Sequence, residues 1–343
     1  MNVAPDTSSE VVARPPGLIQ SLLNGFNAVA THIYLILFPA ALDLLLWFGP
    51  HLRIKTLLAP SLDEFVSLMQ SNATGDMLAT VQTVRTMWQA FLDQFNLVSL
   101  VSTFPVGVPS LFGGAMPVNN PLGAPAQMEL HSMGQLAWVM IVLILLGLLL
   151  GSLYFGLVAQ VTQKVMAALD GRQPAVTHAF SMGGLGWQTG QVLVLILLLL
   201  IVLFMVLAPA LAIMAVVSLI SGVLSEIVLL LAGLGAIWLL LPLIFSPQGI
   251  FLYNLNAPAA IMSSARIVRT IMPGAGLFLL AEIVINQGLG MLWSIPPATS
   301  WMALVGVLGH AFIVTALLAA SFVYYRGGLN YIQALQKSVV SNL

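Results

Sequence analysis

The side chains that could do chemistry in this sequence are few, and they lie in stretches that are otherwise apolar. Asp43, Glu282 and His310 each lie within a stretch of sequence that is long enough and apolar enough to cross a membrane. An ionisable side chain at the centre of a bilayer costs about 2.5–3.5 kcal/mol on insertion scales, so each is a candidate functional group. His32 is a fourth ionisable residue, but it lies nearer the end of its stretch, where water can solvate it.

Glu282 and His310 are the best candidates for a shared site. Glu282 comes nine residues into Gly274–Trp293, and His310 comes about ten residues into Ser300–Tyr325. As consecutive antiparallel helices, these stretches would bring both side chains to similar depth, with Asn286 one turn beyond Glu282 on the same face. Together with Asp43, the group predicts a site for a proton or a polar substrate. The alternative is a buried hydrogen bond that pins the two helices.

No motif for catalysis or cofactor binding accompanies these residues. The absence of cysteine excludes disulfides, thiolate metal sites and cysteine nucleophiles within the chain. The sequence also lacks H-E-x-x-H, G-x-S-x-G and a P-loop, and Gly184–Gly190 lacks the spacing of a dinucleotide fingerprint. We therefore expect no catalytic residue, no metal and no cofactor.

Composition defines the elements that must position these residues. Of 343 residues, 59% are hydrophobic and 6% are charged, whereas soluble domains carry about 25% charged residues. The 10 Lys and Arg against 11 Asp and Glu give no basic surface for nucleic acid. The sequence predicts an all-α, polytopic membrane helical bundle, because backbone groups in lipid must pair internally.

Six stretches reach the roughly 20 apolar residues that a bilayer crossing requires. They are 28–48, 135–158, 191–217, 226–251, 274–293 and 300–325. Pro39, Pro209, Pro242 and Pro247 are expected to kink or interrupt these helices.

The distribution of Lys and Arg predicts the orientation. With the N-terminus inside, seven basic residues fall in inner segments, three fall in the long outer loop, and the two short outer loops have none. Because cytoplasmic loops are enriched in Lys and Arg, this distribution predicts that both termini are cytoplasmic, in the plasma membrane of a prokaryote. The cytoplasmic parts are then 1–27, 159–190, 252–273 and 326–343.

The inner segments share a pattern in which a proline opens a mixed apolar and polar stretch before a span. Pro16, Pro174 and Pro258 open Gly17–Ala30, Ala175–Gly183 and Ala259–Met272. Proline suits the first helical position, so these stretches predict interfacial helices. The alternative is that any inner loop contains proline and small residues.

The outer loop, 49–134, is predicted to be a short helical subdomain. Apolar residues recur every three or four positions over Met77–Phe95, which indicates an amphipathic helix whose apolar face rests on the bilayer or on the bundle. Phe104–Pro125 is rich in proline and glycine, so we expect an irregular loop there, with a re-entrant stretch as the alternative.

Two glycine pairs have the spacing that permits close helix packing. They are Gly147 with Gly151, inside the second span, and Gly186 with Gly190, before the third. Such pairs serve internal packing or self-association.

Three short segments carry a resemblance to a known group. They are Ala168–Val176, Ala260–Arg269 and the Tyr324–Arg326 that closes the last span. Over about Gln135–Arg326, their order resembles six-span prokaryotic membrane proteins related to the membrane-anchor domain of glycerophosphodiester phosphodiesterases. The resemblance implies a helical membrane module without the separate catalytic domain of those enzymes, and it transfers no active residue.

Three functions remain open at this point. A non-catalytic accessory or scaffold module, not an enzyme, fits the scarcity of polar groups. A small-solute or lipid transporter would use the polar site near Glu282 and His310, and a membrane-embedded lipid enzyme would need further acid and base groups. The expected partners are membrane lipids and other membrane subunits, not nucleic acid, and the oligomeric state is open.

Overall fold

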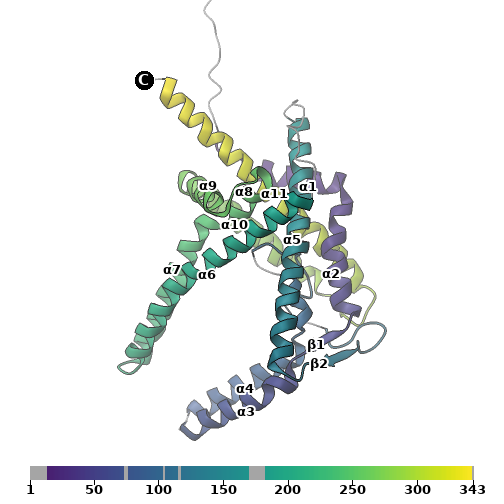
Figure 1. Ribbon diagram of the computed structural model, residues 1–343, viewed down its shortest axis with the longest axis vertical. Helices are drawn as coiled ribbons and strands as arrows, with labels where there is room; N and C mark the ends of the chain where they lie inside the picture. Colours follow the sequence, from purple (N-terminus) through teal and green to yellow (C-terminus); the bar gives the residue numbers. More distant parts are fainter. Residues whose placement is uncertain (1–13, 73–75, 103–104, 115–116, 170–181, 342–343) are drawn as a thin grey trace, which may run out of the picture.

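The computed structural model describes residues 14–72, 76–102, 105–114, 117–169 and 182–341, and these form the predicted all-α bundle (Figure 1). Two expectations, the surface helix at 175–183 and most of the 168–176 motif, lie largely outside the described residues. The elements are α1 (Leu18–Thr31), η1 (Ile33–Ile36), α2 (Leu37–Phe48), β1 (His51–Arg53), α3 (Lys55–Asn72), α4 (Asp76–Gln94), η2 (Leu97–Val101), β2 (Gln127–Glu129), α5 (Met133–Leu169), α6 (Met182–Ser218), α7 (Gly222–Leu240), η3 (Leu241–Leu243), α8 (Ser246–Tyr253), α9 (Ala257–Thr270), α10 (Met272–Trp293) and α11 (Ala303–Ser341).

The apolar helices make this chain an integral membrane protein. Within the described residues, five helical units are long and apolar enough to cross a membrane, and a bent pair brings the number to six. The bent pair consists of Leu18–Thr31 and Ile33–Phe48, which meet at 92°, so the bend falls inside the predicted first span, 28–48, and only η1 and α2 follow it. The bend falls at His32, which leaves helical geometry with φ −130° and ψ 56°. It does not fall at Pro39, which lies in the first turn of α2, where a missing N–H leaves no helical bond unmade.

The core is built around α11. Its residues from Ala303 to Ile332 include many that are fully buried, and α1 runs antiparallel along it. A Cβ atom at Gly25 would lie 2.4 Å from the backbone nitrogen of Ala320, so only glycine allows this approach. Phe26 packs edge-on against Phe312 in the same contact. Helices are present at the predicted interfacial stretches before the first and fifth spans, as α1 and α9. Helix α1, however, packs lengthwise against α11 from Phe312 to Gly327, largely within the predicted sixth span.

A two-helix arm leaves the body between α2 and α5. After α2 the chain forms β1, which pairs in parallel with β2, and α3 and α4 extend from this point (Figure 1). The predicted amphipathic helix at 77–95 is confirmed as α4, and the subdomain is helical as expected.

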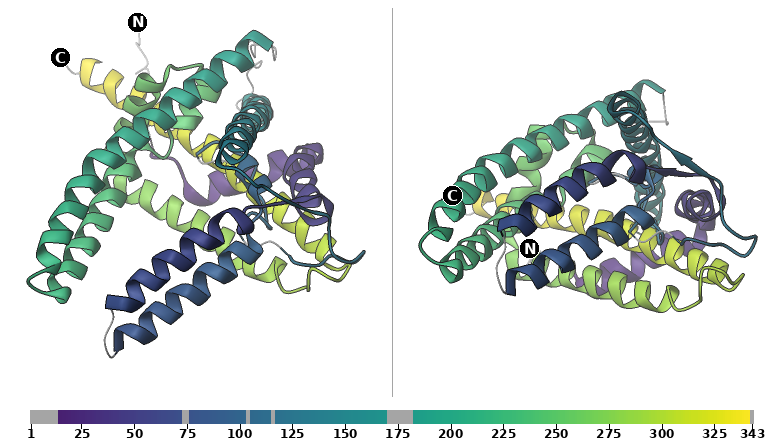
Figure 2. Two further views of the ribbon diagram at one scale, coloured as in Figure 1. Left: turned by 60° about the horizontal axis from the view of Figure 1, so that its bottom comes forward. Right: turned by 90° about the horizontal axis from the view of Figure 1, so that it is seen from below.

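Helices α6 and α7 form a long hairpin that projects from the body (Figure 2). Pro209 lies inside α6 without ending it, whereas Pro242 and Pro247 lie at the break from α7 through η3 to α8. Ser264 of α9 pairs with backbone groups at this break. Its Oγ accepts a hydrogen bond from Phe245 N at 3.1 Å and donates one to Pro242 O at 2.6 Å.

Candidate functional site

An irregular segment inserts between α2 and α5, and we call residues 105–112 the inserted segment. Val106 and Val108 are buried in it. A Cβ atom at Gly151 would lie 2.7 Å from Val106 O, and one at Gly147 would lie 2.5 Å from Val101 O. Gly151 comes 18 residues after Met133, the first residue of α5, which is about 27 Å along the helix. The chain therefore reaches deep along a spanning helix before it returns.

Residues 105–112 are irregular, as we expected, and their contact with Gly151 of α5 is compatible with the alternative of a re-entrant stretch. Irregular backbone at membrane depth is tolerated only where protein buries it or where it lines a cavity. Gly147 and Gly151 do permit a close approach, as predicted, but Gly147 meets Val101 at the end of η2, and Gly151 meets Val106 and Gly107 of the inserted segment, rather than another spanning helix.

Asp43 holds the returning end of the inserted segment. Its side chain is fully buried in α2. Oδ1 accepts from the Ser110 hydroxyl and from Phe112 N at 3.2 Å, and Oδ2 accepts from Leu111 N at 3.1 Å. All three contacts are donors to a carboxylate, and hydrogen bonds to charged groups are the stronger class. The residue predicted for a substrate or proton site thus makes a structural contact to the loop.

The last turn of α2 fixes two further segments. Asn120 Nδ2 donates to Trp47 O at 3.0 Å, and Trp47 Nε1 donates to Ala298 O at 2.8 Å. Trp47 also packs edge-on against Trp301. The loop after the inserted segment and the connection between α10 and α11 therefore meet at the same end of α2.

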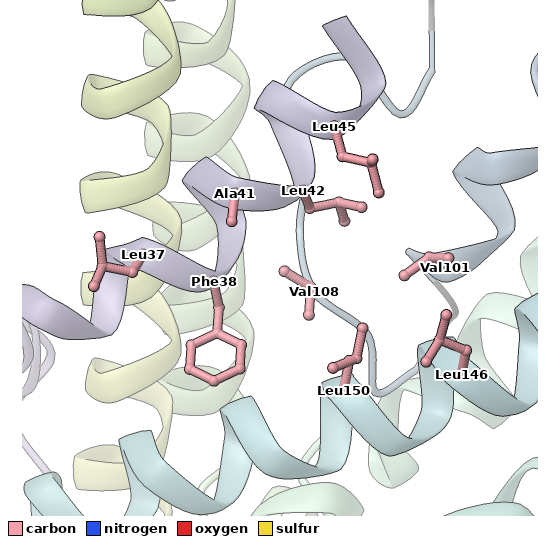
Figure 3. A pocket seen from close by; sticks show the side chains of 9 residues that line it. All are labelled: Leu37, Phe38, Ala41, Leu42, Leu45, Val101, Val108, Leu146 and Leu150. Carbon is pink, nitrogen blue, oxygen red and sulfur yellow. The ribbon is translucent and has the colours of Figure 1, made fainter. Parts of the chain in front are cut away.

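An apolar groove of about 410 Å³ lies beside this anchor, between α2, α5 and the inserted segment (Figure 3). No nitrogen, oxygen or sulfur atom belongs to any side chain that lines it. Leu37, Leu45 and Leu146 at its edges are exposed, whereas Leu42, Val101 and Val108 are buried. The lining residues are Leu37, Phe38, Ala41, Leu42, Leu45, Val101, Val108, Leu146 and Leu150.

Glu282 and His310 are not brought together. Phe278 of α10 stacks on Tyr324 of α11, and a Cβ atom at Gly309 would lie 2.8 Å from the Trp293 ring. These two contacts place Glu282 opposite Ala320, about ten residues from His310, or roughly 15 Å along the helix. Gly306 and Gly309 lie against Trp293, so α11 is shifted along α10 and the two side chains do not reach the similar depth that we expected.

The polar atoms of this group are also left without partners. Glu282 makes no hydrogen bond or ion pair with any described residue, and the two described ion pairs are Lys55–Asp93 and Arg85–Asp63. Asn286 Oδ1 and His310 Nε2 are buried without a partner. No group of three or more metal-ligating side chains occurs among the described residues.

The second glycine pair makes no close contact in the described chain. No heavy atom lies within 4 Å of a Cβ position at Gly186 or Gly190. Two glutamines, one in α5 and one in α6, instead contact the end of α8 and the start of α9. Gln163 donates to Leu252 O at 2.8 Å, and Gln191 accepts from Ala257 N at 2.8 Å.

Sequence reasoning missed the groove and the partner of Asp43. Ser110 lies 67 residues from Asp43, in a segment with no helical or strand periodicity. The only available indication was the pair of valines, Val106 and Val108, within a stretch otherwise rich in proline and glycine.

The comparisons with known proteins add no relative. No family model, curated protein or solved structure matches this chain. The resemblance of 135–326 to the membrane-anchor group therefore stays a prediction.

Proposed function

We propose that this chain is a non-catalytic membrane module that holds a lipid hydrocarbon tail in the groove between α2 and α5. The observation that carries the proposal is the groove itself, which has a purely apolar lining and exposed leucines at its edges. Its volume of about 410 Å³ lies within the range of about 300–1,000 Å³ of small-molecule sites. Lipid is the expected partner that matches this chemistry.

Packing, and not water exclusion, would favour a tail in the groove. Lipid tails already surround a spanning helix, so moving one into the groove brings no hydrophobic gain. The gain comes from dispersion contacts with a fixed wall, each of which is worth only about 0.1–0.2 kcal/mol but which add up along a chain. Asp43 and Gly151 matter to this function because they hold the inserted segment that forms one wall.

A groove-filling substitution tests the proposal. Ala41→Phe places a ring in the groove, whereas Leu44→Phe adds one on the same helix at an exposed position that does not line it. Native mass spectrometry of the detergent-purified chain should show lipid retained by the wild type and by Leu44→Phe, and lost from Ala41→Phe. Equal retention by both variants would exclude the groove as the binding site.

A carrier is the second candidate, and the broken unit from α7 to α8 favours it. Discontinuous helices commonly form the binding sites of transporters. Ser246 Oγ and Gln248 Oε1, at the first turn of α8, are buried without partners. A carrier requires water to reach this break, so Ser246→Cys should react with a small impermeant thiol reagent, while a sealed joint should leave it unreactive.

The proposed location is a prokaryotic plasma membrane with both termini in the cytoplasm. Helix α9, which carries Arg266 and Arg269, and the C-terminal end of α11 lie at one end of the molecule, and the arm lies at the other (Figure 1). Because the chain has no cysteine, single cysteines at Arg269 and at Gln89 of α4 can be labelled separately. Labelling of both from the same side of the membrane would overturn this orientation.

A further inference from the structure

The arm formed by α3 and α4 has one apolar face that the chain leaves uncovered. On α4, Met87, Trp88 and Phe91 are about half exposed or more. Trp88 meets Phe91 edge-on at 5.7 Å between ring centroids, and Phe91 lies 5.1 Å from Phe95. Because these positions are three or four residues apart, they form one stripe along the helix.

The apolar residues of α3 face the same side as this stripe. Val66 and Val81 are buried and mark the line where the two helices pack. Arg85 donates to Asp63 at 3.1 Å, so these two residues mark the polar side of that line on both helices. Phe65 lies on the opposite side of α3 from Asp63 by helical spacing, as Phe91 does from Arg85 on α4. Both stripes therefore belong to a single surface.

The apolar face continues directly from a spanning helix. At the root of the arm, Leu58, Leu62 and Phe95 belong to one hydrophobic cluster with Leu136 and Met140 of α5. The neighbouring α5 residues Trp138 and Ile141 are exposed where α5 would meet lipid. The arm projects from the body (Figure 2), and its apolar face continues from the exposed side of α5 at this root.

The other side of α4 is suited to water. Gln82, Thr86, Gln89 and Asp93 are spaced along it, and all four are exposed. Lys55 pairs with Asp93 at 2.5 Å. A helix with aromatic and sulfur side chains on one face and polar ones on the other is typical of an element lying in the membrane interface, where tryptophan is enriched.

We propose that the arm lies on the bilayer surface, with Met87, Trp88 and Phe91 inserted among the lipids beside α5. The occupant of the face is the lipid surface. The continuity with α5 carries this choice, and the inference does not depend on the groove between α2 and α5. The arm would fix the height of the bundle and cover the lipid next to the groove.

Spin labels can measure this insertion because the chain has no cysteine. The full chain is reconstituted in vesicles of phosphatidylcholine and phosphatidylglycerol with one cysteine at Met87 or Phe91, or, as matched controls on the same helix, at Gln82 or Gln89. Collision with oxygen and with a water-soluble nickel complex then reports depth. We expect Met87 and Phe91 to lie about 5–10 Å below the headgroup boundary and Gln82 and Gln89 to remain in water.

Two outcomes would overturn the proposal. All four labels in water would show an arm that stands off the membrane. Labels at Met87 and Phe91 that neither reagent reaches would show a protein, such as a second copy, on this face. Fluorescence quenching by brominated lipid serves as a second measurement without a label, and Trp88→Phe should remove part of the quenched signal of the wild type. An unchanged quenched fraction would also contradict insertion.

Discussion

Asp43 and Glu282 are both carboxylates in apolar helices, yet their surroundings differ completely. Asp43 accepts hydrogen bonds from Ser110, Leu111 and Phe112, which all come from the inserted segment. Glu282 has no such bond to any described residue. A buried charge is tolerated when donors surround it and is costly when they do not. Asp43 therefore anchors the inserted segment to α2, whereas Glu282 in α10 has no partner among the described residues.

The role of an acid in a spanning helix therefore depends on which hydrogen-bond donors a distant segment brings to it. Asp43 is matched by three donors, as a structural anchor must be. Within the described chain, Glu282 has no such donors, and Asn286, one turn away, is also without a partner at Oδ1.

Asp43→Ala should have the largest effect. It leaves two backbone N–H groups and one hydroxyl unsatisfied, and each orphaned buried group costs about 1–3 kcal/mol. We expect a loss of at least about 3 kcal/mol in the free energy of unfolding, measured by SDS titration of the reconstituted chain. Ser110→Ala removes only one of the donors and should lose less. Equal losses for both variants would mean that the backbone contacts of Asp43 contribute nothing.

Gly151→Ala should have the next largest effect, with Gly186→Ala as its matched control in another spanning helix. The added methyl group at Gly151 would lie 2.7 Å from Val106 O, whereas at Gly186 it meets open space. Overpacking costs about 1–3 kcal/mol, and replacing a helical glycine by alanine without a clash gains about 0.5–1 kcal/mol. Opposite signs are therefore expected in thermal melts, and two stabilised variants would show that the inserted segment moves freely.

The sequence could predict the helices and the importance of particular positions but not their partners. Hydropathy gives the spans because hydrocarbon imposes one rule on every residue, and α10 begins and ends within two residues of the predicted 274–293. The bend at His32 depends on how α1 packs against α11, which no local pattern encodes. The distance between Glu282 and His310 depends on the register of α10 against α11, and the fold-back of residues 294–302 sets that register.

The candidate site could likewise be predicted only in part from the sequence. Asp43 and the Gly147–Gly151 pair could be selected by type and spacing alone. Their shared neighbour could not, because Val101–Phe112 has neither the 3.6-residue period of a helix nor the alternation of a strand. Only long-range packing brings this segment between α2 and α5.

Protonation of His51 should have a smaller effect on stability. His51 begins β1, just after the end of α2, and lies outside the spanning helices. Burial lowers its pKa below the usual value of 6.5, as does the nearby charge of Arg53, while its hydrogen bond to Leu46 O opposes the shift. The unfolded chain then binds a proton at a pH where the folded chain does not. The contribution of neutral His51 to the free energy of unfolding should be fully present above about pH 6.5 and should be lost as the pH decreases below that value. Thermal melts of wild type and His51→Gln should diverge there, and parallel curves would contradict the shift.

Glu282→Gln should have the smallest effect on stability, because this acid, unlike Asp43, has no partner in the part of the chain that the structure describes. The change removes the ionisable group while keeping the size of the side chain, and no described hydrogen bond or ion pair is lost with it. We expect the free energy of unfolding to change by less than about 0.5 kcal/mol, or to rise if the carboxyl was destabilising. Asp43→Asn is the matched comparison and should lose stability, because its new NH₂ group would face donors. A large loss for Glu282→Gln would show that this carboxyl has a partner within the assembled protein, and the distinction between the two acids would then disappear.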